Sequence, residues 1–237
     1  MKILAIDTSS RALCLGVSDS DKVYEYNLEL GTRISALLAP TILRVVNSLG
    51  WKINEIDYFC AGIGPGSFTG LRVGLAAVKA LSWSLNKPVV GISSLDILAQ
   101  NAGKGSSFII PVIDAKRDMV YASIYKNQRG QISRVAAYML LGSRELALKI
   151  RKKISAKALR ESVILGDGLN ICSREFPASL KGIKILDKDY WRLEGRNLIA
   201  LAKLAIQQKR SSDAFSVKPL YLYPKECQIR KYPLHSK

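Results

Sequence analysis

The chain has 237 residues, 48% of them hydrophobic, which is enough for one large core or for two smaller lobes. Its 36 Lys and Arg against 19 Asp and Glu give a net charge of +17. The only histidine, His235, lies three residues from the end, which argues against histidine-based acid–base chemistry and His-rich metal sites. The scattered cysteines favour reduced thiols in the cytoplasm: Cys14, Cys60, Cys172 and Cys227.

The first residues, MKILAIDTSS, predict a strand and no signal peptide, and we expect no membrane span. Apolar runs with polar turns between them predict strands over residues 2–8, 12–19, 22–29, 56–62 and 87–93. Helical spacing predicts helices over residues 34–49, about 69–86, and 94–102, the last of them capped by serine. Pro40 should bend the first helix, and Gly50 should end it.

The pattern restarts after the turn at residues 103–107. Strands are predicted over 108–115, 118–126, 131–139, 162–166 and 183–186, and helices over 143–153 and 194–209. LAIDTSSRALCLGV and PVIDAKRDMVYASIY each predict a strand ending in Asp, a turn and a second strand, a weak repeat with a period of about 107 residues. The sequence therefore predicts an α/β fold of two related lobes, each a mixed sheet flanked by helices. The N-terminal lobe with the partner-binding helices is predicted over residues 1–102, the basic C-terminal lobe over 103–209 and an extended tail over 210–237.

The excess of basic over acidic residues lies almost entirely in the second part of the chain. Residues 1–101 hold 9 basic and 8 acidic residues, whereas residues 102–237 hold 27 basic and 11 acidic residues. This imbalance predicts a polyanion, RNA or DNA, near the second lobe. The alternative is a lysine-rich surface that only aids solubility.

Two aspartates, Asp7 and Asp114, end the first strands of the two lobes. At the carboxyl ends of strands they would face a cleft, where they could hold a metal bound to nucleotide phosphates. The alternative for DTSS is ordinary hairpin-turn chemistry. We predict a nucleotide-type cleft that is vestigial, formed by Asp7, Thr8, Ser9, Asp114, Gly166, Asp167 and Gly168.

The segment GIGPGSFTGLRVG, residues 62–74, leads into the second helix, which Ser67 or Thr69 can cap. Helix starts attract anions, but this is no Walker loop because no Gly-Lys-Ser/Thr follows. The apolar ring of Phe68 offers no hydrogen-bond donor or positive charge to an anion, and it is more typical of a protein interface.

Gly70 and Gly74 lie four residues apart and form a strip without side chains on one face of this helix. Such a strip lets a second helix approach closely, at about 1 kcal/mol of helix stability per glycine. We interpret it as a contact with a partner helix, with tight packing against the chain's own sheet as the alternative.

Four segments, ILAIDTS, GPGSFTGLRVGLAAVKAL, DAKRDMVYA and LGDG, together resemble the TsaB/YeaZ family over about residues 1–170. The resemblance implies the two-lobed fold of the actin-like ATPase (ribonuclease H-like) superfamily. It also implies a non-catalytic scaffold that binds and activates TsaD, the enzyme that forms threonylcarbamoyladenosine next to the anticodon of tRNA. The implied assembly includes the ATPase TsaE and self-pairing through the same helices, with tRNA bound through the complex and no cofactor or metal.

By the same resemblance, the partner interface consists of Arg33, Ser35, Ser67, Phe68, Thr69, Gly70, Arg72, Val73 and Gly74. The chain departs from the family's Arg-x-His-Ser-Glu signature, because Ile34 and Ala36 replace the His and Glu. The metal ligand that TsaD-like enzymes carry on this helix is therefore missing, and the interface is more apolar. The family's C-terminal Pro-x-Tyr-Leu-Arg appears as PLYLY, with Tyr223 in place of Arg.

Two other functions can be weighed against the scaffold. An active ATPase or phosphotransferase would use Asp7, Asp114 and residues 166–168, but 237 residues leave little room for a substrate site. A peptidase is disfavoured because there is no HExxH and a serine triad would have to recruit His235.

Overall fold

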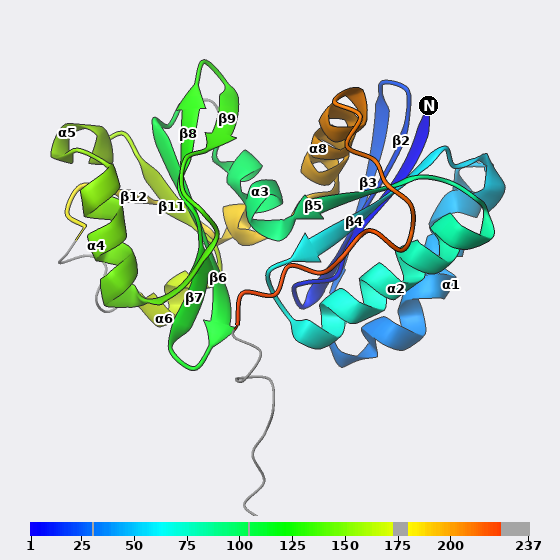
Figure 1. Cartoon of the computed structure of the whole chain (residues 1–237), viewed down its shortest axis with the longest axis horizontal. Helices are drawn as coiled ribbons and strands as arrows, with labels where there is room; N and C mark the ends of the chain where they lie inside the picture. Colours follow the sequence, from blue (N-terminus) through cyan, green and yellow to red (C-terminus); the bar gives the residue numbers. More distant parts are fainter. Residues whose placement is uncertain (30, 104, 173–179, 224–237) are drawn as a thin grey trace, which may run out of the picture.

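The computed structural model describes residues 1–29, 31–103, 105–172 and 180–223, which form two lobes side by side (Figure 1). Cys227, His235 and the rest of the predicted tail beyond residue 223 lie outside the described residues. No helix in the described ranges is long and apolar enough to cross a bilayer.

The first lobe is built on a 5-stranded sheet with the order β3-β2-β1-β4-β5. Its strands are β1 (Lys2–Asp7), β2 (Ala12–Asp19), β3 (Lys22–Glu29), β4 (Tyr58–Gly64) and β5 (Val89–Ser93). The first three form an antiparallel meander, and β4 and β5 run parallel to β1. β1 is buried on both faces, since Leu4 and Ile6 point into one core cluster while Ile3 and Ala5 point into another.

The second lobe repeats this topology. Its strands are β6 (Phe108–Lys116), β7 (Met119–Ala122), β8 (Tyr125–Gln128), β9 (Gln131–Arg134), β10 (Met139–Gly142), β11 (Val163–Leu165) and β12 (Lys184–Ile185). The main path is β10-β7-β6-β11-β12, with β7 antiparallel to β6 and β10, and with β11 and β12 parallel to β6. The predicted repeat of two mixed sheets flanked by helices is therefore confirmed.

Helices cover both sheets (Figure 1). In the first lobe, α1 (Ile34–Ser48) and α2 (Phe68–Ser84) pack on one face, and α3 (Ser94–Ala99) and α8 (Gly195–Gln207) share a core cluster with the other. In the second lobe, α4 (Ser143–Lys153), α5 (Ala156–Leu159) and α6 (Leu169–Cys172) pack on the outer face of the sheet. Short 3-10 helices occur at Gly31–Arg33, Ile53–Glu55, Gln100–Ala102 and Lys188–Trp191.

The sequence analysis grouped α8 with the second lobe, whereas in the structure this helix packs across the first sheet. Buried Leu198 and Ile199 belong to the same cluster as Ile3 of β1. The backbones meet closely, because a Cβ added to Gly16 of β2 would lie 2.5 Å from the carbonyl oxygen of Gly195. The chain thus returns to its first lobe after completing the second sheet.

Two predicted strands of the second lobe are each divided in the structure. Residues 118–126 form β7 and β8, and residues 131–139 end as β9 before β10 begins. The division has a hydrogen-bonding cause, since the Ile124 carbonyl accepts from the amides of Val135 (2.8 Å) and Ala136 (3.2 Å). The two runs are pinned to each other at this point, and β8–β9 leave the path as a separate hairpin.

Residues 212–223, which we call the strap, run across the front of the molecule from the first lobe to the second (Figure 1). Ser212 and Val89 exchange two backbone hydrogen bonds of 2.9 Å, and the Leu220 amide donates to the Ile63 carbonyl at 2.7 Å. At the far end, the Tyr223 hydroxyl donates to the Ala115 carbonyl at 3.0 Å. The described part of the predicted tail is thus packed on both lobes.

Candidate partner-binding surface and nucleotide-type cleft

The loop between β4 and α2 is fastened to the β1–β2 turn. Ser67 caps α2, because its hydroxyl oxygen accepts from the Gly70 amide at 3.2 Å, and its own amide donates to the Ser9 carbonyl at 2.7 Å. A Cβ on Gly66 would lie 2.5 Å from the same Ser9 carbonyl. The helix start is therefore occupied by the chain itself.

The glycine strip of α2 faces inward. A Cβ on Gly70 would lie 2.0 Å from the Thr8 carbonyl oxygen, and one on Gly74 would lie 2.1 Å from Thr8 Oγ1. The buried Thr8 hydroxyl donates to the Gly70 carbonyl at 2.7 Å. This corrects our interpretation of the strip: the close approach that the glycines permit is made to the chain's own β1–β2 turn, and the partner residues predicted at Gly70 and Gly74 are buried.

The opposite face of α2 is exposed. The Arg72 guanidinium lies 3.8 Å from the centre of the Phe68 ring, which is 42% exposed, and Phe68 packs against Tyr221 of the strap with ring centres 5.2 Å apart. Arg72 Nε also donates to the Tyr221 hydroxyl at 3.3 Å. This cluster holds Phe68 at the surface in one orientation.

The remaining predicted interface residues surround the same region. Ser67 and Thr69 are exposed beside Phe68, and Val73 is half-buried one turn along α2. Arg33 and Ser35 are exposed at the start of α1, which packs beside α2.

Together, α1 and α2 present a surface of small and apolar side chains, which we call the helix-pair surface. Its exposed small and apolar residues are Ala36, Ala39, Pro40 and Leu43 of α1 and Ala76, Ala80 and Trp83 of α2, with Val73 half-buried. Exposed polar residues of the same helices include Ser35, Arg44, Asn47 and Arg72. Leu43 is 50% exposed and Trp83 is 70% exposed. Sequence analysis did not single out Leu43, Ala76 or Trp83, although their helical spacing opposite the buried positions was the available signal.

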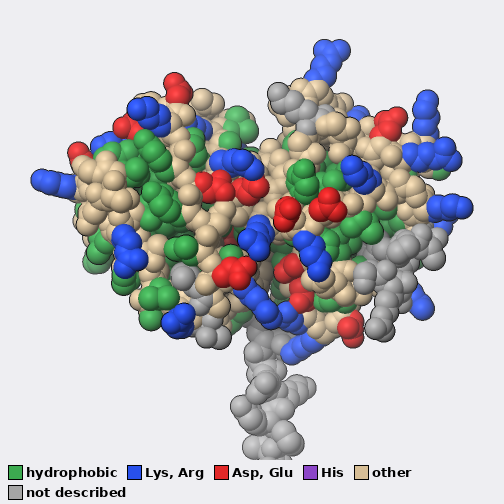
Figure 2. Space-filling model, turned by 180° about the vertical axis from the view of Figure 1, so that it is seen from behind, with side chains coloured by type: hydrophobic (Ala, Val, Ile, Leu, Met, Phe, Trp, Pro, Cys, Tyr) green, Lys and Arg blue, Asp and Glu red, His purple; other side chains and the backbone are tan. Residues whose placement is uncertain are grey.

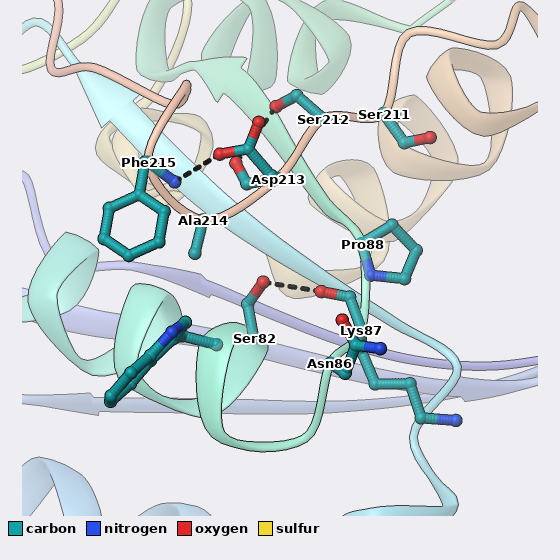
Figure 3. A pocket seen from close by; sticks show the side chains of 10 residues that line it. Ser82, Asn86, Lys87, Pro88, Ser211, Ser212, Asp213, Ala214 and Phe215 are labelled. Carbon is teal, nitrogen blue, oxygen red and sulfur yellow. Dashed lines mark hydrogen bonds between the residues drawn. The ribbon is translucent and has the colours of Figure 1, made fainter.

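A groove lies at the carboxyl end of this surface (Figure 3). It has a volume of about 520 Å³ between the end of α2 and residues 211–215, with the exposed Phe215 at its rim. The Ser82 hydroxyl donates to the Lys87 carbonyl at 2.5 Å, and Asp213 accepts from the Phe215 amide at 2.7 Å. Two protruding aromatic rings, Trp83 and Phe215, thus flank an open channel that the sequence did not predict.

In the predicted cleft, Asp7 is fully buried. Its carboxylate accepts from the Ser94 hydroxyl and from the Ser9 amide, both at 2.6 Å, and the Ser9 hydroxyl donates to Ser94 at 2.9 Å. A Cβ on Gly62 would lie 2.0 Å from Asp7 Oδ2. Burial raises the pKa of Asp7, opposed by the hydrogen bonds from Ser94 and Ser9. This carboxylate points into packed protein.

The second-lobe residues form a separate cluster. Asp167 accepts from the Asp114 amide at 2.9 Å, and Asp114 forms an ion pair with Lys116. Desolvation by surrounding protein raises the pKa of Asp167, and the Asp114 carboxylate adds to that rise. Gly166 has a φ of 119°, and a Cβ there would lie 2.0 Å from the Val112 carbonyl. Gly168 donates its amide to that carbonyl at 3.2 Å, so the turn closes onto β6.

An apolar cluster fills the region between the two aspartates. Leu95 follows Ser94, the partner of Asp7, and Ala115 follows Asp114; both are buried in one cluster with Tyr121, against which Leu222 and Tyr223 of the strap pack. The Tyr223 ring stands edge-on to Tyr121 at 6.1 Å. The structure therefore does not bring the seven predicted residues together in one open cleft. Within the described ranges, no group of three or more His, Cys, Asp or Glu could hold a metal ion.

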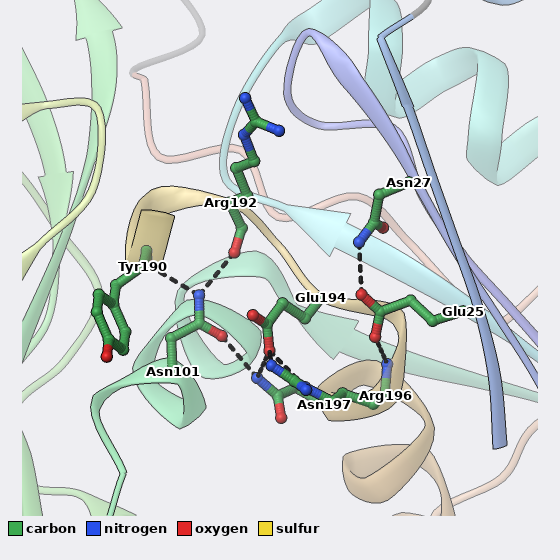
Figure 4. Close-up of polar contacts among 8 residues, drawn as sticks. All are labelled: Glu25, Asn27, Asn101, Tyr190, Arg192, Glu194, Arg196 and Asn197. Atoms are coloured by element: carbon green, nitrogen blue, oxygen red, sulfur yellow. Dashed lines mark hydrogen bonds and ion pairs between the residues drawn. The ribbon is translucent and has the colours of Figure 1, made fainter. Parts of the chain in front are cut away.

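A network of polar side chains centred on Asn101, which follows α3, joins the two lobes (Figure 4). The side-chain amide of Asn101 donates to the carbonyls of Tyr190 (2.8 Å) and Arg192 (2.6 Å). Asn197 of α8 donates to Asn101 Oδ1 at 2.6 Å. These contacts fasten the link between the lobes to the segment before α8, so they position the lobes and carry no chemistry.

Comparisons with known proteins agree with this geometry. The family model for TsaD, described as tRNA N6-adenosine threonylcarbamoyltransferase, matches residues 32–211. The Bacillus subtilis tRNA threonylcarbamoyladenosine biosynthesis protein TsaB is 35% identical over 136 residues, which are 57% of this chain and 59% of that protein. The protein of the same name from Buchnera aphidicola is 30% identical over 189 residues, covering 78% of this chain and 87% of that one.

One solved structure covers almost the whole chain. It is a Pseudomonas aeruginosa protein described as similar to peptidase YEAZ, with a TM-score of 0.81 and 25% identity, covering 94% of this chain and 99% of that one. The matched region spans less than two thirds of the Bacillus relative, whereas this structural match spans both chains. By family model, sequence identity and fold, the chain belongs to the TsaB/YeaZ family.

Proposed function

We propose that this chain is a non-catalytic scaffold subunit that binds and activates TsaD during formation of threonylcarbamoyladenosine next to the anticodon of tRNA. The observation that carries the proposal is the helix-pair surface, where α1 and α2 lie side by side with small or apolar residues facing outward. The relatives named TsaB are named for biosynthesis of that modified nucleoside, which supports the pathway.

The helix-pair surface suits a helical partner. Because the side chains of the alanines at positions 36, 39, 76 and 80 are short, a second pair of helices can approach the α1 and α2 backbones closely. Leu43 and Trp83 supply larger apolar area at its edges, and Arg72 with Phe68 supplies a cation beside a ring. A surface of this kind is costly to leave in water and is stabilised by a partner.

The non-catalytic part of the proposal is supported by the buried Asp7. A carboxylate that binds a nucleotide-bound metal must be reachable, whereas Asp7 is enclosed by Ser94, Ser9 and Gly62. The cluster around Leu95 and Tyr223 fills the adjoining region. These contacts disfavour the alternative of an active ATPase or phosphotransferase.

The wider assembly follows from the same proposal. TsaE joins the complex of this chain with TsaD, tRNA binds to that complex in the cytoplasm, and two copies of the chain can pair through the helix-pair surface when TsaD is absent. Because both pairings use one surface, TsaD and a second copy compete.

The test is co-purification with TsaD of the same organism and a tRNA modification assay with and without this chain. Ala76→Arg places a long cation on the exposed face of α2, and we expect it to weaken TsaD binding at least tenfold, a loss of about 1.4 kcal/mol. Ala156→Arg, the same change at an exposed helical position of the second lobe, is the matched control and should bind normally.

Two results would contradict the proposal. One is modification of tRNA by TsaD that does not depend on this chain, and the other is ATP turnover by the chain after TsaD has been removed. Equal TsaD affinity of Ala76→Arg and the unchanged chain, by calorimetry, would reject the helix-pair surface as the docking site.

A further inference from the structure

The outer end of the second lobe carries a dense group of basic side chains. Residues 143–161, which contain α4 and α5, hold seven basic and two acidic residues. All seven basic side chains are exposed, and we give the name basic end to the six that follow Arg144: Lys149, Arg151, Lys152, Lys153, Lys157 and Arg160. Figure 2 shows Lys and Arg side chains projecting from the outer edge of this lobe, with further Lys and Arg side chains on the first lobe and near the middle of the molecule.

The basic end is not neutralised by neighbours. None of its six side chains forms an ion pair with a described residue, while Lys2 pairs with Glu55 and Arg196 with Glu194 elsewhere. The group also extends beyond one helix, because Arg160 packs on the backbone of Gly182, which follows the exposed Lys181.

Helix stability explains only part of this charge. Cations in the last turn of α4 interact favourably with the helix dipole, which accounts for Arg151, Lys152 and Lys153. Lys157 and Arg160 lie at the end of α5, where the dipole of a four-residue helix is small, and Lys149 lies before the last turn of α4. Holding so many like charges close together is unfavourable unless a counter-charge binds there.

The chemistry of the surface favours RNA over a membrane. A helix that lies in a bilayer exposes a broad apolar face, but Leu146, Ala147 and Ile150 of α4 are buried in the core of the second lobe. Lysines and arginines spread over two helices, with Lys181 in a neighbouring turn, suit a string of phosphates.

We propose that the basic end of the second lobe binds the phosphate backbone of tRNA directly. The choice of RNA as the polyanion rests on the proposed function. α4 and α5 lie at the opposite end of the molecule from α1 and α2 (Figure 1), so tRNA and TsaD can be bound at the same time. The chain then holds the substrate as well as the enzyme.

The experiment measures binding of a labelled tRNA transcript by fluorescence anisotropy over a series of salt concentrations. We expect Lys152→Glu with Lys153→Glu to weaken binding at least about tenfold and to reduce the slope of log affinity against log salt by roughly 2. The matched control, Lys22→Glu with Lys209→Glu, makes the same charge change at exposed positions of the first lobe and should keep most of the affinity.

Equal loss in both double variants would overturn the proposal in favour of a general charge effect, as would absence of tRNA binding by the unchanged chain at low salt. Binding to vesicles with anionic lipids that depends on Lys152 and Lys153, without tRNA binding, would overturn it in favour of a membrane. TsaD affinity and circular dichroism are measured for every variant. If the Lys152→Glu, Lys153→Glu variant binds TsaD normally but binds tRNA weakly, the proposal for the basic end is supported. If the unchanged chain binds tRNA but does not bind TsaD, only the proposed scaffold function is rejected.

Discussion

The outer helical layers of the two lobes cover sheets of the same topology but present opposite chemistry to solvent. α1 and α2 of the first lobe expose alanines, Pro40, Leu43 and Trp83, whereas α4 and α5 of the second expose lysines and arginines. The inward faces are alike, since both bury aliphatic residues against a mixed sheet. The two lobes therefore share a core pattern, while the chemistry of their exteriors differs.

The largest expected effect is a loss of stability when a side chain is added on the inward face of α2, compared with the same change at the start of α4. Gly74→Ala places a Cβ 2.1 Å from Thr8 Oγ1, so we expect it to destabilise the chain by about 2–3 kcal/mol although alanine favours helix. Gly142→Ala, at the start of α4, meets no atom within 4 Å and should change stability by less than about 0.5 kcal/mol. Urea denaturation measures both, and equal stabilities would mean that α2 can move away from Thr8.

A smaller effect concerns the strap, which joins the lobes. Tyr223→Phe removes the hydroxyl that donates to the carbonyls of Ala115 and Lys116, and we expect a loss of about 1 kcal/mol. Tyr190→Phe is the control, because the Tyr190 hydroxyl makes no hydrogen bond with a described residue. An unchanged melting temperature for Tyr223→Phe would show that the strap adds nothing to the union of the lobes.

The smallest effect is a pH dependence of the free energy of unfolding, which tests whether Asp7 is a buried carboxyl group or an accessible metal ligand. Burial raises the pKa of Asp7 above 3.8, so the folded chain holds this proton more tightly and loses stability as pH rises from 3.8 toward the folded pKa. The Asp7→Asn side chain cannot ionise. The free energy of unfolding of this variant, relative to that of the unchanged chain, should therefore rise between pH 3.8 and the folded pKa and should be constant at higher pH. A constant difference from about pH 4 to about pH 7 would contradict a raised pKa.

Much of the fold follows from local patterns. β2 and β3 begin and end at the predicted residues, because apolar runs are bounded there by polar turns. The pairing of β1 with β2 and of β6 with β7 was visible as a repeat around Asp7 and Asp114. α8 was placed with the wrong neighbours by sequence order, since its apolar stripe does not reveal which sheet it covers.

The site was harder to predict because spacing shows that residues share a face and does not show what the face meets. Gly70 and Gly74 do form a strip, yet the group that approaches them is Thr8 of the same chain. The residues that we propose to face a partner lie on the other side of α2, where alanines are as compatible with solvent as with an interface. Trp83 and Phe215 come together only because the strap returns to α2.

The strap also limits how far the molecule can flex. Leu220 is hydrogen-bonded to β4 and the Tyr223 hydroxyl to the end of β6, and the backbone from Leu220 to Tyr223 spans at most about 11 Å. A wide separation of the lobes would therefore require one of these two hydrogen bonds to break. The lobes are thus joined at two places, by the strap and by the link near Asn101, and this double connection favours one fixed arrangement of the proposed helix-pair surface relative to the basic end.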